Sequence, residues 1–96
     1  MRLRYSKRAS ADIADIHEYI AQHNRRAATA VVRQIRSTSA LLSQYPELGR
    51  ETDIPGVRVF SIARYPYLIY HHVQGNEVII VHVRHGRQEA PPPGEM

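Results

Sequence analysis

The N-terminal half of the chain alternates apolar and polar residues with two different periods. Residues 2–5 alternate one by one, as a half-buried strand does. From Lys7 onward the apolar side chains recur every three or four residues, which places them on one stripe of a helix. Ser6 is suited to cap this helix, because its hydroxyl can accept a free N–H of the first turn. The stripe consists of Ala9, Ile13, Ile16 and Ile20.

A second helical stripe follows a short interruption at His23 and Asn24. Asn24 is a favourable N-cap, and the periodic pattern then continues to about Gln44. Two amphipathic helices joined by so short a loop predict an antiparallel helix hairpin. The second stripe consists of Ala28, Val31, Ile35, Thr38 and Leu42.

The C-terminal half changes to a period of two. Tyr45 precedes Pro46, and the residue before a proline avoids the helical region, so the second helix ends here. A loop that contains Pro55 and Gly56 follows. Three runs rich in β-branched and aromatic residues then predict three strands, over residues 57–62, 67–73 and 77–84.

Gly75–Asn76 predicts a two-residue hairpin loop between the last two strands, since both residues tolerate a positive φ. Gln74 then faces Glu77, and a regular register follows from that pair. It pairs Tyr70 with Val81, Ile69 with His82, Leu68 with Val83 and Tyr67 with Arg84.

This register assigns the strand residues to two faces. The apolar face, which we expect to receive the helix hairpin, consists of Leu68, Tyr70, Ile79, Val81 and Val83. The opposite face is mixed and carries Tyr67, His71, His82 and Arg84. The sequence therefore predicts an α+β fold in the order β-α-α-β-β-β, with an antiparallel sheet packed against an α-helical hairpin.

Length and composition predict one small domain. Of 96 residues, 43% are hydrophobic, so we expect residues 1–88 to fold as one domain. Residues 89–96 are rich in proline and are expected to be disordered. The absence of cysteine excludes disulfides, thiolate metal sites and thiol catalysis. The sequence contains no apolar segment long enough to indicate a membrane span or a signal peptide. We therefore expect a cytoplasmic location.

The charge is positive and unevenly distributed. Residues 1–40 hold 8 basic and 3 acidic groups, whereas residues 41–96 hold 5 and 6, for a total of +4. Twelve of the 13 cations are arginine, which suits bidentate contact with carboxylate or phosphate. Such a surface attracts an acidic protein or a nucleic acid, and the charge alone does not distinguish them.

The histidines do not predict a metal site. His82 and His85 are three residues apart in a strand and therefore point to opposite faces, and His71 and His72 are adjacent and do the same. A cluster of arginines with aromatic and imidazole neighbours is more informative, because such groups can hold phosphate, stack on bases or anchor a protein interface. It comprises Arg58, Arg64, Arg84 and Arg87 with Tyr65, Tyr67, His82 and His85.

Several strings, in this order, resemble the ParE/RelE superfamily of bacterial toxins, over nearly the whole chain. They are Pro46-Glu47-Leu48-Gly49-Arg50, Pro55-Gly56-Val57-Arg58-Val59-Phe60, Tyr67-Leu68-Ile69-Tyr70 and Val83-Arg84-His85-Gly86-Arg87. The resemblance implies the toxin of a type II toxin–antitoxin system, held inactive in a hetero-oligomer by an acidic, ParD-like antitoxin. It implies no cofactor and no metal.

Two activities divide this superfamily, and the site residues favour the ParE-like one. RelE-like members cut mRNA on the ribosome, and ParE-like members inhibit DNA gyrase by protein–protein contact without acting as enzymes. Arg87 matches a family arginine and Arg58 stands where a lysine is expected, but Tyr67 replaces a key RelE arginine and Phe60 a second lysine. No matching C-terminal tyrosine is present. The resemblance thus implies a gyrase interface of Arg58, Arg64, Tyr67, Arg84 and Arg87.

Two alternatives remain open from the sequence. One is a ribosome-dependent mRNA endonuclease whose candidate catalytic residues are Arg58, His82, His85 and Arg87, with the histidines as acid or base. The other is a non-toxic protein that only binds the antitoxin. For antitoxin binding we expect the helix hairpin, through Ile16, Ile20, Val31, Ile35, Arg33 and Arg36, together with the edge of the sheet.

Overall fold

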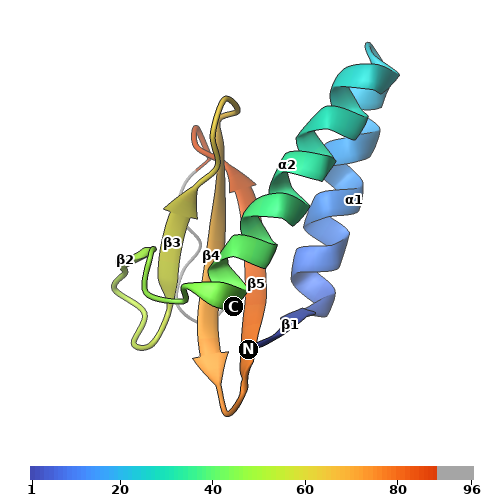
Figure 1. The fold of residues 1–96 in the computed structure, drawn as a ribbon. Helices are drawn as coiled ribbons and strands as arrows, with labels where there is room; N and C mark the ends of the chain where they lie inside the picture. The colour runs from blue at the N-terminus through green and yellow to red at the C-terminus, as the bar shows by residue number, and fades with distance from the viewer. Residues whose placement is uncertain (89–96) are drawn as a thin grey trace.

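The computed structural model describes residues 1–88, and the proline-rich segment 89–96 that was expected to be disordered lies outside the described residues. Two helices lie on one side of a five-stranded sheet (Figure 1). This confirms the predicted α+β fold and the predicted order of elements, to which the structure adds one short strand. The elements are β1 (Arg2–Tyr5), α1 (Lys7–Ala21), α2 (Arg25–Gln44), β2 (Arg50–Glu51), β3 (Arg58–Ser61), β4 (Tyr67–Gln74) and β5 (Glu77–His85).

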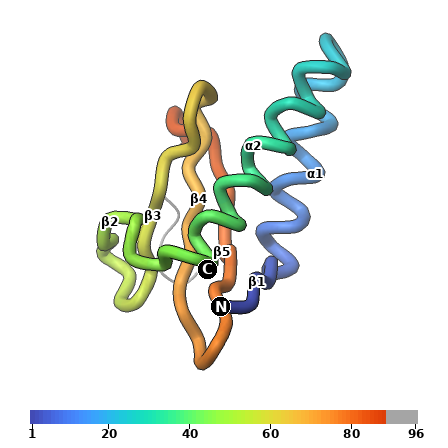
Figure 2. The backbone as a smooth tube through the Cα atoms, viewed as in Figure 1, coloured from blue at the N-terminus to red at the C-terminus, as the bar shows by residue number. Residues whose placement is uncertain are grey.

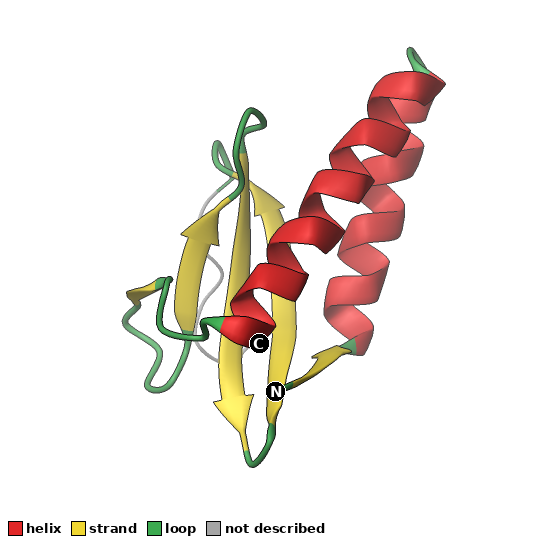
Figure 3. Ribbon diagram, viewed as in Figure 1, coloured by secondary structure: helices red, strands yellow, loops and turns green. Residues whose placement is uncertain are grey.

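The sheet is antiparallel except at one edge. Its strand order is β1-β5-β4-β3-β2, and β1 pairs with β5 in parallel. Figure 3 shows the sheet and the helix hairpin as two layers. Among the described residues, no helix is long and apolar enough to cross a membrane. The same residues contain no group of three or more His, Asp or Glu side chains placed to hold a metal ion.

Both helices begin at the predicted caps. The Ser6 hydroxyl accepts the amide of Ala9 at 3.0 Å, and the side-chain oxygen of Asn24 accepts the amide of Ala27 at 3.0 Å. The two helices run side by side in opposite directions (Figure 2). Their buried stripes meet the sheet in one apolar core, in which Ile35, Leu42, Ile69 and Ile80 are completely buried.

The predicted register of the last hairpin holds for only half of its length. Pairing runs from Gln74 opposite Glu77 to His71 opposite Ile80, as expected, and then shifts by one residue. Val81 is the extra residue of a β-bulge at this point. The predicted partners of Tyr70, Ile69, Leu68 and Tyr67 are therefore wrong, because a bulge breaks the regular count that a hairpin loop sets. The observed pairs are Tyr70 with His82, Ile69 with Val83, Leu68 with Arg84 and Tyr67 with His85.

The predicted faces of the sheet are also largely wrong. The helices cover the face that carries Tyr67, Ile69, Val78, Ile80 and Val83, so Val83 alone of the expected helix-facing set lies there. Both faces of the central strands are apolar, and alternation by itself cannot tell which of two apolar faces receives the helices. The opposite face holds a second apolar cluster of Val57, Val59, Tyr70, Ile79 and Val81, with Ile54 and Leu68 packed against it.

Candidate functional site

Beyond the end of β1, the edge of β5 is covered by the start of α1. The Ser6 amide donates to the carbonyl of Ile80 at 2.9 Å, and its hydroxyl donates to the carbonyl of Val81 at 3.2 Å. Six residues further along, the carboxylate of Asp12 accepts the Val83 amide at 3.0 Å and contacts Nδ1 of His82 at 2.6 Å. An ionised carboxylate only accepts, so this ring nitrogen carries the proton. His82, with 6% of its surface exposed, is therefore an anchor between sheet and helix.

Arg84 is engaged inside the fold on the face away from the helices. Its Nε donates to the Tyr70 hydroxyl at 2.9 Å, and its guanidinium lies 5.5 Å from the centre of the Tyr70 ring. Nη1 donates to the carbonyl oxygens of His85, at 3.3 Å, and Gln88. With 9% of its surface exposed, Arg84 fixes the end of β5 and offers little to a partner.

One end of the sheet gathers several of the predicted target residues. Tyr67 and His85 are paired across β4 and β5, and their rings meet edge to face at 5.3 Å. The Gly86 amide donates to the Pro66 carbonyl at 2.7 Å, which joins the turn before β4 to the end of β5. Arg64 and Arg87 are exposed on these two turns. We call Arg64, Tyr67, His85 and Arg87 the sheet-end cluster.

A pocket of about 370 Å³ opens beside this cluster, between α1 and the ends of β4 and β5. Burial raises the pKa of the Tyr67 phenol, and the nearby Tyr19 hydroxyl raises it further, so the phenol stays protonated at neutral pH. The pocket is lined by Asp15, Ile16, Tyr19, Tyr67, His85 and Gln88.

Arg58 lies elsewhere. It is paired with His71, four residues along β4 from Tyr67, which is about 13 Å at the usual rise of a strand. Its Nη1 donates to the carbonyl of Gly49 at 2.7 Å and contacts that of Glu47 at 3.5 Å. The structure thus brings Arg64, Tyr67 and Arg87 of the predicted gyrase interface together. It buries both Tyr67 and Arg84, with 8% and 9% of their surfaces exposed, and separates Arg58 from the other residues.

The residues proposed for RNA cleavage are not assembled around one point. His85 and Arg87 are neighbours, since the ring Nδ1 of His85 accepts the amide of Arg87 at 3.0 Å. His82 is turned to Asp12 on α1, and Arg58 is held at the loop that follows α2.

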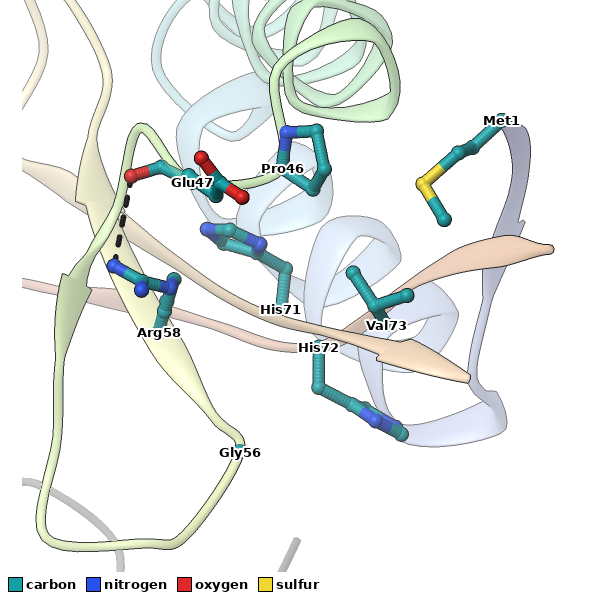
Figure 4. A pocket seen from close by; sticks show the side chains of 8 residues that line it. All are labelled: Met1, Pro46, Glu47, Gly56, Arg58, His71, His72 and Val73. Carbon is teal, nitrogen blue, oxygen red and sulfur yellow. Dashed lines mark hydrogen bonds between the residues drawn. The ribbon is translucent and has the colours of Figure 1, made fainter. Parts of the chain in front are cut away.

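A second pocket, of about 460 Å³, lies between the loop after α2 and β4 (Figure 4). His71 forms part of its wall and is completely buried. In the described part of the chain neither of its ring nitrogens has a hydrogen-bond partner. Burial, followed by the charges of Arg58 and His72, lowers the pKa of His71 to about 4. From the sequence, His71 was expected on the mixed face of the sheet and was not a candidate site residue.

The residues expected to bind the antitoxin divide into two groups. Val31 and Ile35 are core residues with 3% and 0% of their surface exposed, so they are not available to a partner. Ile16 and Ile20 are half-buried against the same core. Arg33 and Arg36 are exposed on α2, and the Arg36 guanidinium lies 5.3 Å from the centre of the Tyr5 ring.

Comparison with known proteins agrees with this fold. The family model described as "ParE toxin of type II toxin-antitoxin system, parDE" matches residues 3–90. The chain is 32% identical to the putative toxin Y4kP of Sinorhizobium fredii over 90 residues, and this aligned region covers 94% of this chain and 93% of that protein. It is 31% identical over 81 residues to toxin ParE3 of Caulobacter vibrioides, covering 81% of this chain and 79% of ParE3.

A solved structure shows the same arrangement. The structure described as the chromosomal ParDE system from P. aeruginosa superimposes with a TM-score of 0.80 at 27% identity, covering 88% of this chain and 95% of the other. The family match spans the helix hairpin and all of the five strands except the first residue of β1. This chain is therefore a member of the ParE toxin family of type II toxin–antitoxin systems.

Proposed function

We propose that this toxin inhibits DNA gyrase by protein–protein contact through the sheet-end cluster. The observation that carries the proposal is the pair of exposed arginines, Arg64 and Arg87, beside the pocket at Tyr67 and His85. Arginine and aromatic side chains are the residues that dominate many protein interfaces, and here exposed arginines lie near a pocket that aromatic rings line. Arg84 supports this surface from within by fixing the end of β5.

The placement of the candidate catalytic residues favours a contact inhibitor over a ribonuclease. Cleavage of RNA without a metal needs a base, a cation and an acid within reach of one phosphate. Arg58 is about 13 Å along the strands from the sheet-end cluster, and Asp12 holds the Nδ1 proton of His82. Of the four residues considered, His85 and Arg87 alone are adjacent.

The partner that neutralises this toxin is, in the same proposal, a ParD-like antitoxin in a hetero-oligomer. The family assignment and the ParDE system from P. aeruginosa support it. The surface best suited to an acidic partner is the exposed face of α2, because this helix carries four arginines and no carboxylate. Arg33 and Arg36 lie on it, and the half-buried Ile16 and Ile20 supply apolar contact on α1.

The decisive experiment assays the purified chain in parallel for gyrase inhibition and for ribosome-dependent cutting of mRNA. We expect loss of supercoiling with accumulated cleavage complexes, and intact mRNA. Replacement of both Arg64 and Arg87 by alanine should weaken inhibition about tenfold or more, whereas the exposed Arg26→Ala serves as a matched control.

Three outcomes would contradict the proposal. Cutting of mRNA with gyrase unaffected would make the chain an endonuclease with His85 and Arg87 as candidates. Activity against neither target, with antitoxin binding retained, would support the non-toxic alternative. Equal inhibition by the double variant and the wild type would place the gyrase interface outside the sheet-end cluster.

A further inference from the structure

The pocket between the loop after α2 and β4 contains a polar group that the fold leaves unsatisfied. Neither Nδ1 nor Nε2 of His71 has a partner within residues 1–88, although the side chain is completely buried. Folded proteins pair nearly all buried polar atoms, so an exception calls for a physical explanation. A group that arrives with a ligand is one such explanation.

Both nitrogens of the ring are buried, but they differ in what surrounds them. Gly49 approaches Nε2 so closely that a Cβ at this position would lie 2.5 Å from it. The backbone of the loop therefore closes this side of the ring, and a ligand in the pocket is left with Nδ1. In Figure 4 the exposed side chain of Glu47 lies over the ring, and it has to move aside for a ligand to enter.

The rest of the lining favours one kind of ligand. Arg58 contributes the guanidinium of a side chain that is about one-third exposed, and its ion pair with the exposed Glu51 is long, at 3.8 Å. Together with a protonated Nδ1 of His71 it offers donors, which an acceptor such as a carboxylate satisfies. Met1 and Val73, with 50% and 45% of their surfaces exposed, add apolar lining that suits the aliphatic part of a peptide side chain.

We propose that this pocket, the His71 pocket, binds the carboxylate of an acidic side chain on a partner protein. The nearby Glu47 and Glu51 disfavour a polyanion such as nucleic acid, because a single guanidinium does not offset its charge. A single carboxylate carries less charge than a polyanion and requires only that the exposed Glu51 give up its long ion pair with Arg58, at 3.8 Å. This inference does not depend on gyrase being the target.

Binding of a carboxylate has a consequence for the ring. A negative charge next to the imidazole favours its protonated form, so the ligand raises the pKa of His71. The same linkage requires that the protein takes up a proton when it binds the carboxylate at a pH near this raised pKa.

The test is an NMR titration of the full chain with N-acetyl-glutamate amide, with N-acetyl-glutamine amide as the neutral control and methyl phosphate as a nucleic-acid mimic. We expect the glutamate probe to shift the His71 ring nitrogens and the Gly49 amide and to raise the pKa of His71. The glutamine probe should leave these signals unchanged. His23→Asn is the matched control, because His23 is exposed between α1 and α2 and does not line this pocket.

Two variants should change the affinity for the glutamate probe in opposite directions. Arg58→Gln removes the cation and should weaken binding of the glutamate probe about tenfold or more. Glu47→Gln removes a competing negative charge at an exposed side chain and should tighten binding, without touching a buried contact. The second variant keeps the test decisive if loss of the Arg58–Gly49 hydrogen bond disturbs the fold.

The proposal is overturned if the glutamate and glutamine probes shift the His71 signals equally or not at all. It is also overturned if Glu47→Gln leaves the affinity unchanged. Tighter binding of methyl phosphate than of the glutamate probe would indicate a nucleic-acid site and reject the peptide carboxylate.

Discussion

Burial lowers the pKa of His71 to about 4, with smaller contributions from Arg58 and His72, and this couples the residue to the stability of the fold. The folded state keeps the ring neutral, whereas the unfolded chain takes up a proton below about pH 6.5. The free energy of unfolding therefore has its full value above the unfolded pKa and decreases as the pH falls from about 6.5 to about 4. We expect the free energy of unfolding to fall by at most about 3 kcal/mol over this range, measured by urea denaturation.

A substitution separates His71 from the other titrating groups. His71→Leu removes two buried nitrogens without partners and should raise stability at neutral pH by about 1–3 kcal/mol. It should also flatten the pH dependence, which His23→Leu, at an exposed histidine between the two helices, should leave in place. A destabilised variant with the wild-type pH profile would mean that the imidazole is satisfied in solution.

Gly49 is required because of its neighbours. A Cβ here would lie 2.5 Å from His71 Nε2, 3.0 Å from Arg58 Cβ and 3.1 Å from the Val59 carbonyl. Gly49→Ala should therefore cost about 1–3 kcal/mol of unfolding free energy. Gly86→Ala is the control, since its nearest contact would be 3.4 Å. Equal thermal shifts for the two variants would show that the loop after α2 yields to the extra methyl group.

Among the elements, the helices were predictable because their signals are local. Ser6 and Asn24 cap the two helices as their positions indicated, and the apolar stripes give the buried faces. The sheet was less predictable. The bulge at Val81 has no signature in the sequence, and it shifts every partner of β4 beyond His71. The short β2 forms through its contact with β3, which a local pattern does not reveal.

Asp12 connects α1 to β5, and its removal tests that link. Asp12→Ala deprives the Val83 amide and the His82 ring of their acceptor, so we expect a loss of about 2–3 kcal/mol. Hydrogen exchange at the Val83 amide should accelerate in the same variant. Asp15→Ala on the same helix is the control, because Asp15 forms no ion pair within residues 1–88. Matching losses for both variants would argue against the edge contact.

At the scale of the whole molecule, the sequence indicated which residues carry charge but not how the fold uses them. Arg84 was expected at an interface, yet it stacks on Tyr70 inside the protein. Arg58 was grouped with Arg87, yet it belongs to the opposite part of the sheet. Such long-range placements depend on the register and on the bulge. Of the four arginines that were grouped together, Arg64 and Arg87 lie at one end of the sheet, whereas Arg84 is buried and Arg58 lies apart from them.

The fold separates two exposed arginine pairs, and the proposed function assigns them to different partners. Arg33 and Arg36 lie on α2, whereas Arg64 and Arg87 lie on turns at the end of the sheet. Reversal of the first pair to glutamate should weaken binding of a ParD-like antitoxin about tenfold or more and reduce its salt dependence. Reversal of the second pair should abolish gyrase inhibition and leave antitoxin binding intact. Calorimetry and supercoiling assays on both variants would decide, with thermal melting to confirm folding. If either variant loses both properties, the two partners share one surface.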